Sequence, residues 1–274
     1  MKSDRNVRDH RIETSLEDFA GLWVALTEQE TVAGVGNTAS DATHAARIAW
    51  PKERLRVVFV SKYPPHVPMP AWLLKALRGL ALKGTLWLIG GAVRDLLLGR
   101  EPDDWDFVVS EGALQLARSV ANRMDGDFYV LDPERGTGRA IVTPPYENRP
   151  VHLDFALLRG ASIEEDLEAR DFSINAIAMS VEGQIVDPTG GLKDLARDRL
   201  SMVRQDALSS DPIRLLRAVR LSRQFNLSID QETVEAIHRL APMINAVAVE
   251  RIQAEVTKLL KVPRSDLDLV ALKR

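Results

Sequence analysis

The stretch IGGAVRDLLLGREPDDWDF, residues 89–107, contains the features that decide the fold of this chain. An apolar segment, TLWLI (85–89), ends at the pair Gly90-Gly91, and the helix-forming segment AVRDLLL follows. Three aspartates then fall within four residues, 103–106, at the start of the apolar segment WDFVV. The order of strand, glycine pair, helix and acidic strand indicates a phosphate-binding turn beside a group of carboxylates.

The spacing of these residues points to one kind of chemistry. Asp104 and Asp106 are two positions apart, so in a strand both carboxylates point to the same face, where a hard cation such as Mg²⁺ could hold them. Backbone N–H groups after Gly90-Gly91 can bind phosphate, and Arg94 adds a bidentate cation one turn later. Taken alone, the aspartates fit a solvated loop end and the glycines a tight turn. Together they indicate phosphoryl or nucleotidyl transfer, in which two metal ions clamp the reacting oxygens.

The composition excludes several classes of protein. The 274 residues are 45% apolar, which is enough for two domains or for one domain with an extension. The absence of cysteine excludes disulfides, thiolate catalysis and cysteine–zinc sites, and the five histidines lack zinc-binding spacing. The net charge of −3 excludes only a uniformly basic surface. No apolar run is long enough to span a membrane and the first residues lack a signal peptide, so we expect a cytoplasmic protein.

Proline and the hydrophobic periodicity divide the chain into units. YPPHVPMP (63–70) contains four prolines, which make it a stiff linker and the best domain boundary. A small α/β unit comes before the linker, and an α/β unit followed by a helical one comes after it. The expected segments are a polar tail 1–14, the small unit 15–62, the linker 63–70, the larger α/β unit 71–190, the helical unit 191–262 and a tail 263–274.

Each unit has its expected elements. In the small unit these are a hairpin (22–28 and 31–36), a helix (40–50) and a strand (54–60). Its GVGNTA (34–39) fits GxGxxA, yet we interpret it as a turn because the following strand is basic where dinucleotide binding needs an acidic residue. In the larger α/β unit we expect helices at 71–82, 92–99 and 112–124, and strands at 85–89, 105–109, 127–132, 139–144 and 151–158. The segment 171–181 fits helix or strand, and helices are expected at 211–225, 230–244 and 249–260.

Two further groups of charged residues stand out. Asp154 lies in the apolar strand VHLDFALL, where a charge needs a partner or a metal unless it faces solvent. Arginine recurs at every third position of one helix, and such a cationic face is either solvated or bound to a phosphate-rich partner. These arginines are Arg214, Arg217, Arg220 and Arg223. Asp211-Pro212 has the pattern of an N-cap followed by proline at the start of that helix.

Five motifs occur in the order of a known family. GGAVRDLLLG…DDWD resembles the nucleotidyltransferase head of the class II tRNA nucleotidyltransferases (CCA-adding enzymes) and bacterial poly(A) polymerases. The later motifs that resemble this family are EDLEARDFSINAIA (165–178), VDPTGGLKDL (186–195), SDPIRLLRAVRLSRQF (210–225) and VERIQAEVTKLL (249–260). The resemblance covers residues 71–262. It implies a polymerase-β-like mixed-sheet head (71–190) followed by an all-α neck (191–262) that recognises the nucleotide base.

The resemblance also implies roles for single residues. Gly90, Gly91 and Arg94 would bind the triphosphate of the incoming nucleotide. Asp104 and Asp106 would bind two Mg²⁺ ions, and Asp154 would be the general base toward the primer 3′-hydroxyl.

Further roles fall on residues of the head and neck. Arg170, Asp171 and Asn175 would bind nucleotide phosphate and ribose. Asp211 and Arg214 would pair with the base edge, and Arg217 and Arg220 would complete the pocket. The chain departs from the family pattern at Ser210, where the family has Glu, and at Ala169, where it has Arg.

The implied activity is addition of CMP or AMP, from CTP or ATP, to RNA 3′ ends. The tRNA 3′ end is favoured, with poly(A) synthesis as one alternative and a nucleotide-binding module that needs a partner for RNA binding as another. We expect RNA and nucleoside triphosphates as partners, and neither DNA nor a membrane. A protein partner is also considered, because the RNA-holding helical domains of relatives would follow the neck and the chain ends at Arg274.

Overall fold

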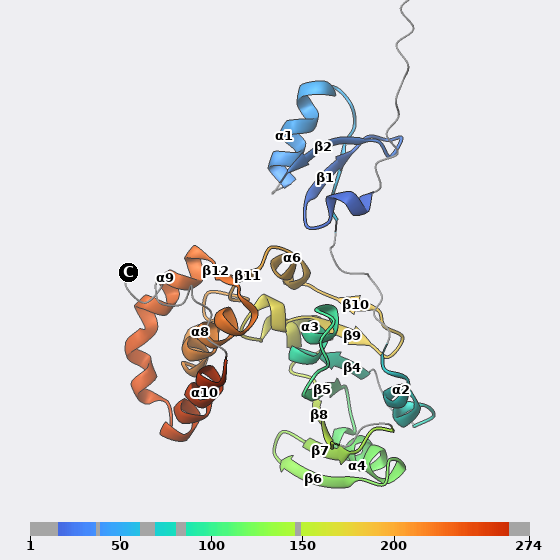
Figure 1. Ribbon diagram of the computed structural model, residues 1–274, viewed down its shortest axis with the longest axis vertical. Coiled ribbons are helices and arrows are strands. Elements are labelled where there is room, and N and C mark those ends of the chain that lie inside the picture. Colours follow the sequence, from blue (N-terminus) through green and yellow to red (C-terminus); the bar gives the residue numbers. More distant parts are fainter. Residues whose placement is uncertain (1–15, 37–38, 61–68, 81–85, 146–148, 263–274) are drawn as a thin grey trace, which may run out of the picture. The chain divides into compact units, whose positions relative to one another are not determined.

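The chain divides into two compact units. The computed structural model describes residues 16–36, 39–60, 69–80, 86–145 and 149–262 (Figure 1). One unit is Met1–Lys62 and the other is Tyr63–Arg274, and each is described by itself. The expected tails and most of the expected linker lie outside the described residues. Among the described residues, no helix has the length and apolar character needed to cross a membrane.

The first unit is a three-stranded antiparallel sheet with one helix packed on it. A 3₁₀ turn η1 (Leu16–Phe19) comes before β1 (Trp23–Leu26), β2 (Val32–Gly36), α1 (Ala39–Ala49) and β3 (Arg56–Phe59). β1 lies between β2 and β3, which confirms the expected hairpin, helix and strand. Gly34 and Gly36 lie within β2, so a turn in GVGNTA could include neither glycine, and its residues 37–38 lie outside the described residues. A Cβ on Gly34 would come within 2.4 Å of the backbone of α1, so these glycines let the helix pack directly on the strand.

The second unit is built on a seven-stranded mixed sheet, as the fold class expected from the sequence requires. The strand order is β10-β9-β4-β5-β8-β7-β6. The strands are β4 (Leu86–Ile89), β5 (Asp104–Val109), β6 (Asp127–Asp132), β7 (Thr137–Val142), β8 (Val151–Leu157), β9 (Ala178–Ser180) and β10 (Ile185–Val186). β5 and β8 are parallel, and the other neighbours in this sheet are antiparallel.

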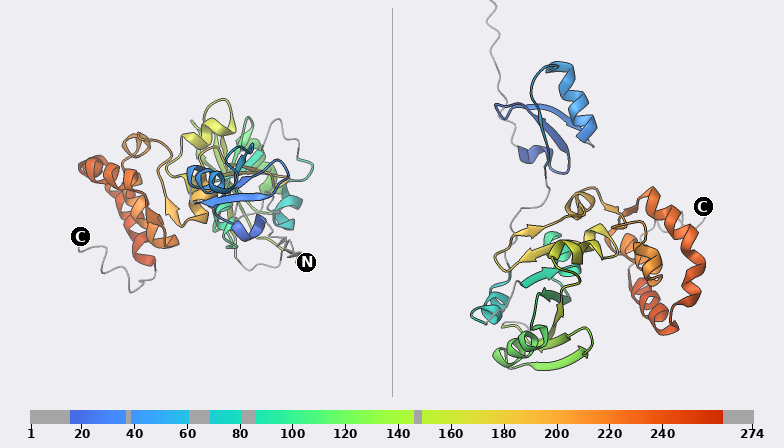
Figure 2. Two further views of the ribbon diagram at one scale, coloured as in Figure 1. Left: turned by 90° about the horizontal axis from the view of Figure 1, so that it is seen from above. Right: turned by 180° about the vertical axis from the view of Figure 1, so that it is seen from behind.

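Helices cover the sheet and then form the neck (Figures 1 and 2). In the head these are α2 (Ala71–Leu77), α3 (Gly91–Leu97), α4 (Ala113–Arg123), α5 (Ile163–Glu168) and η2 (Ser173–Asn175). From residue 191 they are α6 (Gly191–Ala196), α7 (Ala207–Ser210), α8 (Ile213–Phe225), α9 (Gln231–Leu240), η3 (Ala241–Ala246) and α10 (Val249–Lys261), with a short parallel pair β11 (Arg199–Leu200) and β12 (Ser228–Ile229). The ambiguous segment 171–181 contains both kinds of structure, η2 and then β9. α2 ends five residues earlier than expected, just before Gly79, whose φ is +68°.

The larger core of the head lies on one face of the sheet, and a smaller buried cluster that contains Val108 and Leu167 lies on the other. Phe107 stacks on Phe155 with ring centroids 5.0 Å apart, and Trp105 meets the edge of Trp72 at 5.7 Å. Trp105 is only 1% exposed, and burial of rings of this size contributes about 2–3 kcal/mol each. Because side chains alternate along a strand, burying Trp105 and Phe107 directs the intervening Asp106 to the opposite face.

Candidate active site

The predicted carboxylates come together on two neighbouring strands. In the parallel pairing of β5 with β8, Asp106 lies opposite Asp154 and Asp104 lies opposite His152. The Asp104 side chain is 61% exposed, and its Oδ1 is 3.4 Å from Nδ1 of His152. Burial, together with the negative charge of Asp154, raises the pKa of Asp106 to about 6. The site therefore concentrates more negative charge than the surrounding side chains balance.

The donor set suits a hard divalent cation, as the sequence predicts. Asp104 and Asp106 present carboxylate oxygens on one face, which are the ligands that Mg²⁺ prefers. Asp154 is held separately, because Nε and Nη2 of Arg139 donate to its two oxygens, both at 2.7 Å. Among the described residues, no three metal-binding side chains are already gathered around one point. Asp104 and Asp106 are the pair that could hold Mg²⁺ together with substrate oxygens, and their metal-binding role stays a prediction.

The glycine turn and α3 form the other side of the same cavity. Gly90, with φ +70° and ψ −133°, lies directly before α3 and turns the chain from β4 into the helix. Arg94 is buried, donates to Oδ1 of Asn175 at 2.5 Å, and lies 4.0 Å from the centre of the Phe225 ring. A cavity of about 510 Å³, which we call the catalytic cavity, brings together five of the predicted site residues. They are Gly91, Arg94, Asp104, Asp106 and Arg220.

Arg170 and Asp171 are engaged within the chain. Arg170 donates to the buried Asp166, at 2.7 Å from Nη2. A Cβ on Gly90 would lie 3.1 Å from Nη1 of Arg170, so this glycine leaves room for the guanidinium. Asp171 accepts from Nε of Arg217 at 2.8 Å. Burial alone would raise the pKa of Asp171, but the charge and hydrogen bond of Arg217, with further hydrogen bonds from Phe172 and Asn175, hold that pKa below its usual value.

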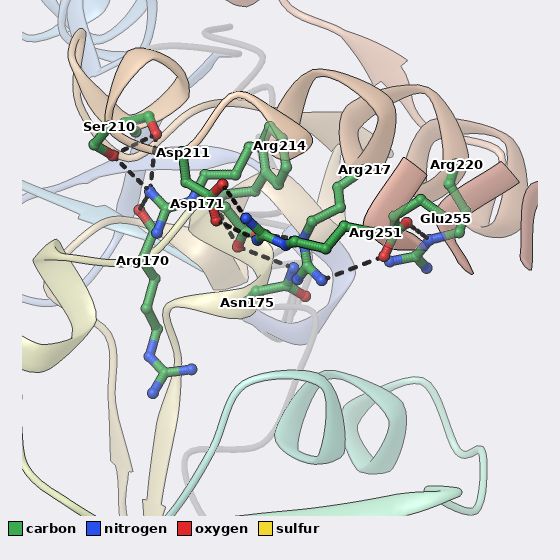
Figure 3. Close-up of polar contacts among 12 residues, drawn as sticks. Arg170, Asp171, Asn175, Ser210, Asp211, Arg214, Arg217, Arg220, Arg251 and Glu255 are labelled. Atoms are coloured by element: carbon green, nitrogen blue, oxygen red, sulfur yellow. Dashed lines mark hydrogen bonds and ion pairs between the residues drawn. The ribbon is translucent and has the colours of Figure 1, made fainter. Parts of the chain in front are cut away.

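The neck arginines are balanced by groups of the same chain (Figure 3). Arg214 donates to the carbonyl oxygen of Ala207 at 2.9 Å and approaches Oγ of Ser210 at 3.4 Å. Arg220 donates to the buried Glu255 at 2.6 Å, and Arg217 lies 3.7 Å from the same carboxylate. From the sequence, either solvent or an outside anion is expected to balance these cations. For Arg217 and Arg220 the chain itself supplies the anions.

Asp211 lies between α7 and α8 and is held by a side chain of α10. Arg251 of α10 donates to both of its carboxylate oxygens, at 3.0 and 2.8 Å. Burial raises the pKa of Asp211, but Arg251 and the N–H of Ile213 together lower it below its usual value. α8 starts at Ile213 with Pro212 at its N-cap and no capping hydrogen bond from a side chain, so the N-cap predicted at Asp211 is wrong by one position.

A second cavity, of about 360 Å³, lies between the head and the neck, and we call it the neck cavity. It gathers five more of the predicted residues, namely Arg170, Asp171, Asp211, Arg214 and Arg217. Glu255 also lines it. Asn175 lines neither cavity, but it links Arg94 to Asp171 through hydrogen bonds of 2.5 and 3.3 Å.

Three side chains that contribute to the site are not predicted from the sequence. Arg139 lies in a strand whose pairing with β8 cannot be read from spacing. Arg251 and Glu255 are four residues apart in α10, and that spacing places both on one helical face. This signal was present in VERIQAEV, but it does not say which helix the face packs against.

The head has the features of a nucleotidyltransferase: carboxylates on a parallel strand pair and a glycine turn before a helix. A helical neck follows it. Residues 86–201 match the model described as "Poly A polymerase head domain". Residues 226–272 match the model described as "Probable RNA and SrmB- binding site of polymerase A".

Individual relatives are similar over the same region. A CC-adding tRNA nucleotidyltransferase of Synechocystis sp. is 43% identical over 67% of this chain and 44% of its own length. An A-adding tRNA nucleotidyltransferase of Deinococcus radiodurans is 36% identical over 64% of this chain and 40% of its own length. The structure of the Thermotoga maritima CCA-adding enzyme complexed with tRNA is 28% identical over 70% of this chain and 46% of its own, with a TM-score of 0.62.

Through its head and neck, this chain belongs to the class II tRNA nucleotidyltransferase and bacterial poly(A) polymerase family. It spans less than half the length of the two tRNA nucleotidyltransferases named above.

Proposed function

We propose that this chain transfers a nucleotide from CTP or ATP to the 3′-hydroxyl of tRNA. The observation that carries the proposal is the catalytic cavity, where the glycine turn and Arg94 meet Asp104 and Asp106. A triphosphate needs cations and N–H groups at one end and a metal-binding carboxylate pair at its α-phosphate. The names of the relatives, which are CC-adding, CCA-adding and A-adding enzymes, support tRNA as the acceptor.

The reaction is an in-line displacement at phosphorus. The primer 3′-oxygen forms a bond to the α-phosphorus, and the bond between the α-phosphorus and the bridging oxygen to the β-phosphate breaks. Pyrophosphate leaves with that electron pair, and the hydroxyl proton goes to Asp154 as general base. Arg139 uses one acceptor site on each oxygen of Asp154, so the proton can go to a second site on either oxygen.

The residues around the reacting atoms have separate tasks. Asp104 and Asp106 would hold Mg²⁺, which supplies charge stabilisation for the attacking and leaving oxygens when bound. Gly91 and Arg94 would position the triphosphate, because they line the same cavity as the aspartates.

The neck cavity is the proposed place of the base. Arg251 and Arg217 hold Asp211 and Asp171 in fixed positions before any ligand arrives, as a protein template requires. Asp211 and Arg214 would offer the polar groups that read the base edge. Of the two triphosphates we propose CTP as the first used, since the relatives with 43% and 39% identity are both named CC-adding.

The test is primer extension by the complete chain. It is incubated with Mg²⁺, radiolabelled CTP or ATP, and tRNA transcripts that end before the CCA sequence, after C and after CC. We expect addition of one or two residues of CMP to the shorter transcripts. Long A tails would instead show poly(A) synthesis, and triphosphate binding without extension would favour a nucleotide-binding module. DNA primers of the same sequence are the control for RNA as the acceptor. The cytoplasmic location remains a prediction of the sequence.

A further inference from the structure

One face of the outer part of the head sheet is open. Along β7 and β8 buried and half-buried residues alternate strictly, apart from the exposed last residue of β8. The buried face packs on α4, since a Cβ on Gly138 would come within 3.1 Å of Ala117 of that helix and of the Phe128 ring. The other face is not covered by α4, and it carries the half-buried residues. It is the face that contains Asp106 and Asp154.

A row of four side chains crosses this open face. The strand registers place Asp106 opposite Asp154, Asp154 opposite Arg139, and Arg139 opposite Tyr129. Side chains directly opposite one another point to the same face of a sheet, and the Arg139–Asp154 ion pair agrees with this. Because neighbouring strands are about 4.8 Å apart, the backbone of Tyr129 lies about 10 Å from that of Asp154. Tyr129 itself is 52% exposed.

The same face opens into a large cavity beyond Asp154. This cavity, of about 1070 Å³, lies between the β6–β7 turn, the end of β8 and the neck, and we call it the hairpin cavity. Thr137 and Ala156 line it, each two residues along the strand from Arg139 and Asp154 and so on the same face. Arg135 of the turn also lines it. The hairpin cavity shares no lining residue with the catalytic cavity, but it shares Asp211, Arg214 and Arg251 with the neck cavity.

We propose that the open face from Asp154 to Tyr129, together with the hairpin cavity, binds the 3′-terminal nucleotides of a single-stranded RNA primer. The Tyr129 ring stacks on a primer base, and Arg139 and Arg135 contact backbone phosphates. Proteins bind single-stranded RNA by stacking its bases on aromatic rings beside cationic groups. Arg139 suits this role because Nε and Nη2 are used by Asp154, whereas Nη1 makes no hydrogen bond to a described residue. The inference rests on the proposed function and locates the binding site of the acceptor RNA on this face of the sheet.

The first test compares Tyr129→Ala with Tyr129→Phe in the complete chain. The probe is a short oligoribonucleotide that ends in the 3′ sequence of a tRNA lacking CCA. Loss of the ring should raise the KM for this RNA about tenfold, since stacking of one base on an aromatic ring is worth that much or more. The phenylalanine variant should restore the KM to within about twofold, because the ring is kept. The KM for CTP, and CTP binding measured without RNA, should stay unchanged in both.

The second test compares two arginines of similar setting. Arg135 pairs with Asp132 in the β6–β7 turn and lines the hairpin cavity, whereas Arg204 pairs with Asp206 and lines none of the three cavities described. Arg135→Ala should raise the KM for RNA several-fold and reduce its salt dependence, and Arg204→Ala should do neither.

The outcomes separate this inference from the proposed function. A normal RNA KM in Tyr129→Ala, with extension still working, would overturn the primer site and leave the proposed function in place. A raised KM for CTP instead would show that the face serves the incoming nucleotide. If the wild-type chain extends no RNA, the proposed function fails. Fluorescence anisotropy of the labelled oligoribonucleotide then still decides whether Tyr129→Ala weakens RNA binding.

Discussion

The two sides of the site differ in how their charges are balanced. On the carboxylate side, burial raises the pKa of Asp106 to about 6, with Asp154 on the adjacent strand adding to the shift. On the arginine side, Arg217 is paired with the buried Asp171, and Arg220 is likewise paired within the neck. The comparison indicates that the arginine side is a preformed framework, whereas the carboxylate side holds unbalanced negative charge that the proposed cation would neutralise.

The largest effect is expected from neutralising the carboxylate side. The double variant Asp104→Asn/Asp106→Asn should lower transfer by about a thousandfold or more, because several kcal/mol of charge stabilisation by metal would be lost. The fold should not suffer. The raised pKa means that the charged form of Asp106 destabilises the folded chain above about pH 6. Replacing this carboxylate with an amide removes the charge, so the Tm should stay the same or increase.

The control for this variant is Asp125→Asn, an exposed aspartate after α4 whose φ of +53° asparagine also tolerates. Transfer is measured by primer extension and Tm by circular dichroism. Activity of the double variant close to that of the control would contradict the metal-binding assignment.

On the arginine side, we expect a stability effect as well as an activity effect. Arg217→Met leaves the buried carboxylate of Asp171 without its partner. The free energy of unfolding should fall by about 2 kcal/mol, less than for a fully buried pair because a third of the Arg217 side chain is exposed. Adding Asp171→Asn should recover part of this loss, since the unpaired charge is removed. Urea unfolding measures the free energy of unfolding of the wild type, both single variants and the double variant. If the losses of the two single variants simply add up in the double variant, the two residues are not coupled.

The same pair gives stability a pH dependence. The pKa of Asp171 lies below its usual 3.8, because Arg217, with further hydrogen bonds from Phe172 and Asn175, outweighs the opposing effect of burial. A carboxylate with a lowered pKa stabilises the fold fully above its unfolded pKa and loses this contribution as pH falls through the folded one. The stability difference between the wild type and Asp171→Asn should therefore be constant from pH 7 to about pH 5 and shrink below about pH 4. A difference that shrinks as pH rises would contradict the assignment. Urea midpoints over this pH range measure it.

The carboxylate side could be predicted from the sequence and most of the arginine framework could not. Asp104 and Asp106 are two residues apart in one strand, so local periodicity alone places them on one face. The partner of Asp154 is Arg139, fifteen residues away, and only the register of β7 on β8 brings them together. Register depends on the pattern of the whole sheet and on the turns, which one strand's sequence does not contain.

The neck shows the same limit in helices. The spacing of arginines in α8 predicts a cationic face, but the buried carboxylate that meets Arg220 comes from α10, 35 residues later. Which helical faces pack together depends on the crossing of the two helices. The secondary structure of segment 171–181 could not be assigned from the sequence for a related reason. Its 3₁₀ turn and its three-residue strand are each too short to show a clear hydrophobic period.

The smallest effect is expected from a substitution next to Arg214, at the border of the arginine side. Ser210, where the family has Glu, approaches Arg214 at only 3.4 Å, and Arg214 is otherwise held by backbone carbonyls. Ser210→Glu should give Arg214 a carboxylate partner and so fix one more polar group of the proposed template. An exposed pair of this kind is worth about 0.5–1 kcal/mol, so we expect the ratio of kcat/KM for CTP and ATP to change by about two- to fivefold.

The matched control for that variant is Ser209→Glu, which adds the same charge one residue earlier, where the serine hydroxyl donates to the carbonyl of Asp206 rather than contacting Arg214. If the ratio of kcat/KM for CTP and ATP is the same in both variants and the wild type, Arg214 is already fixed by its contacts with backbone carbonyls. The arginine side would then be a complete framework without the family's glutamate. A change in the CTP/ATP ratio in Ser210→Glu alone would show that a carboxylate at position 210 fixes Arg214 further.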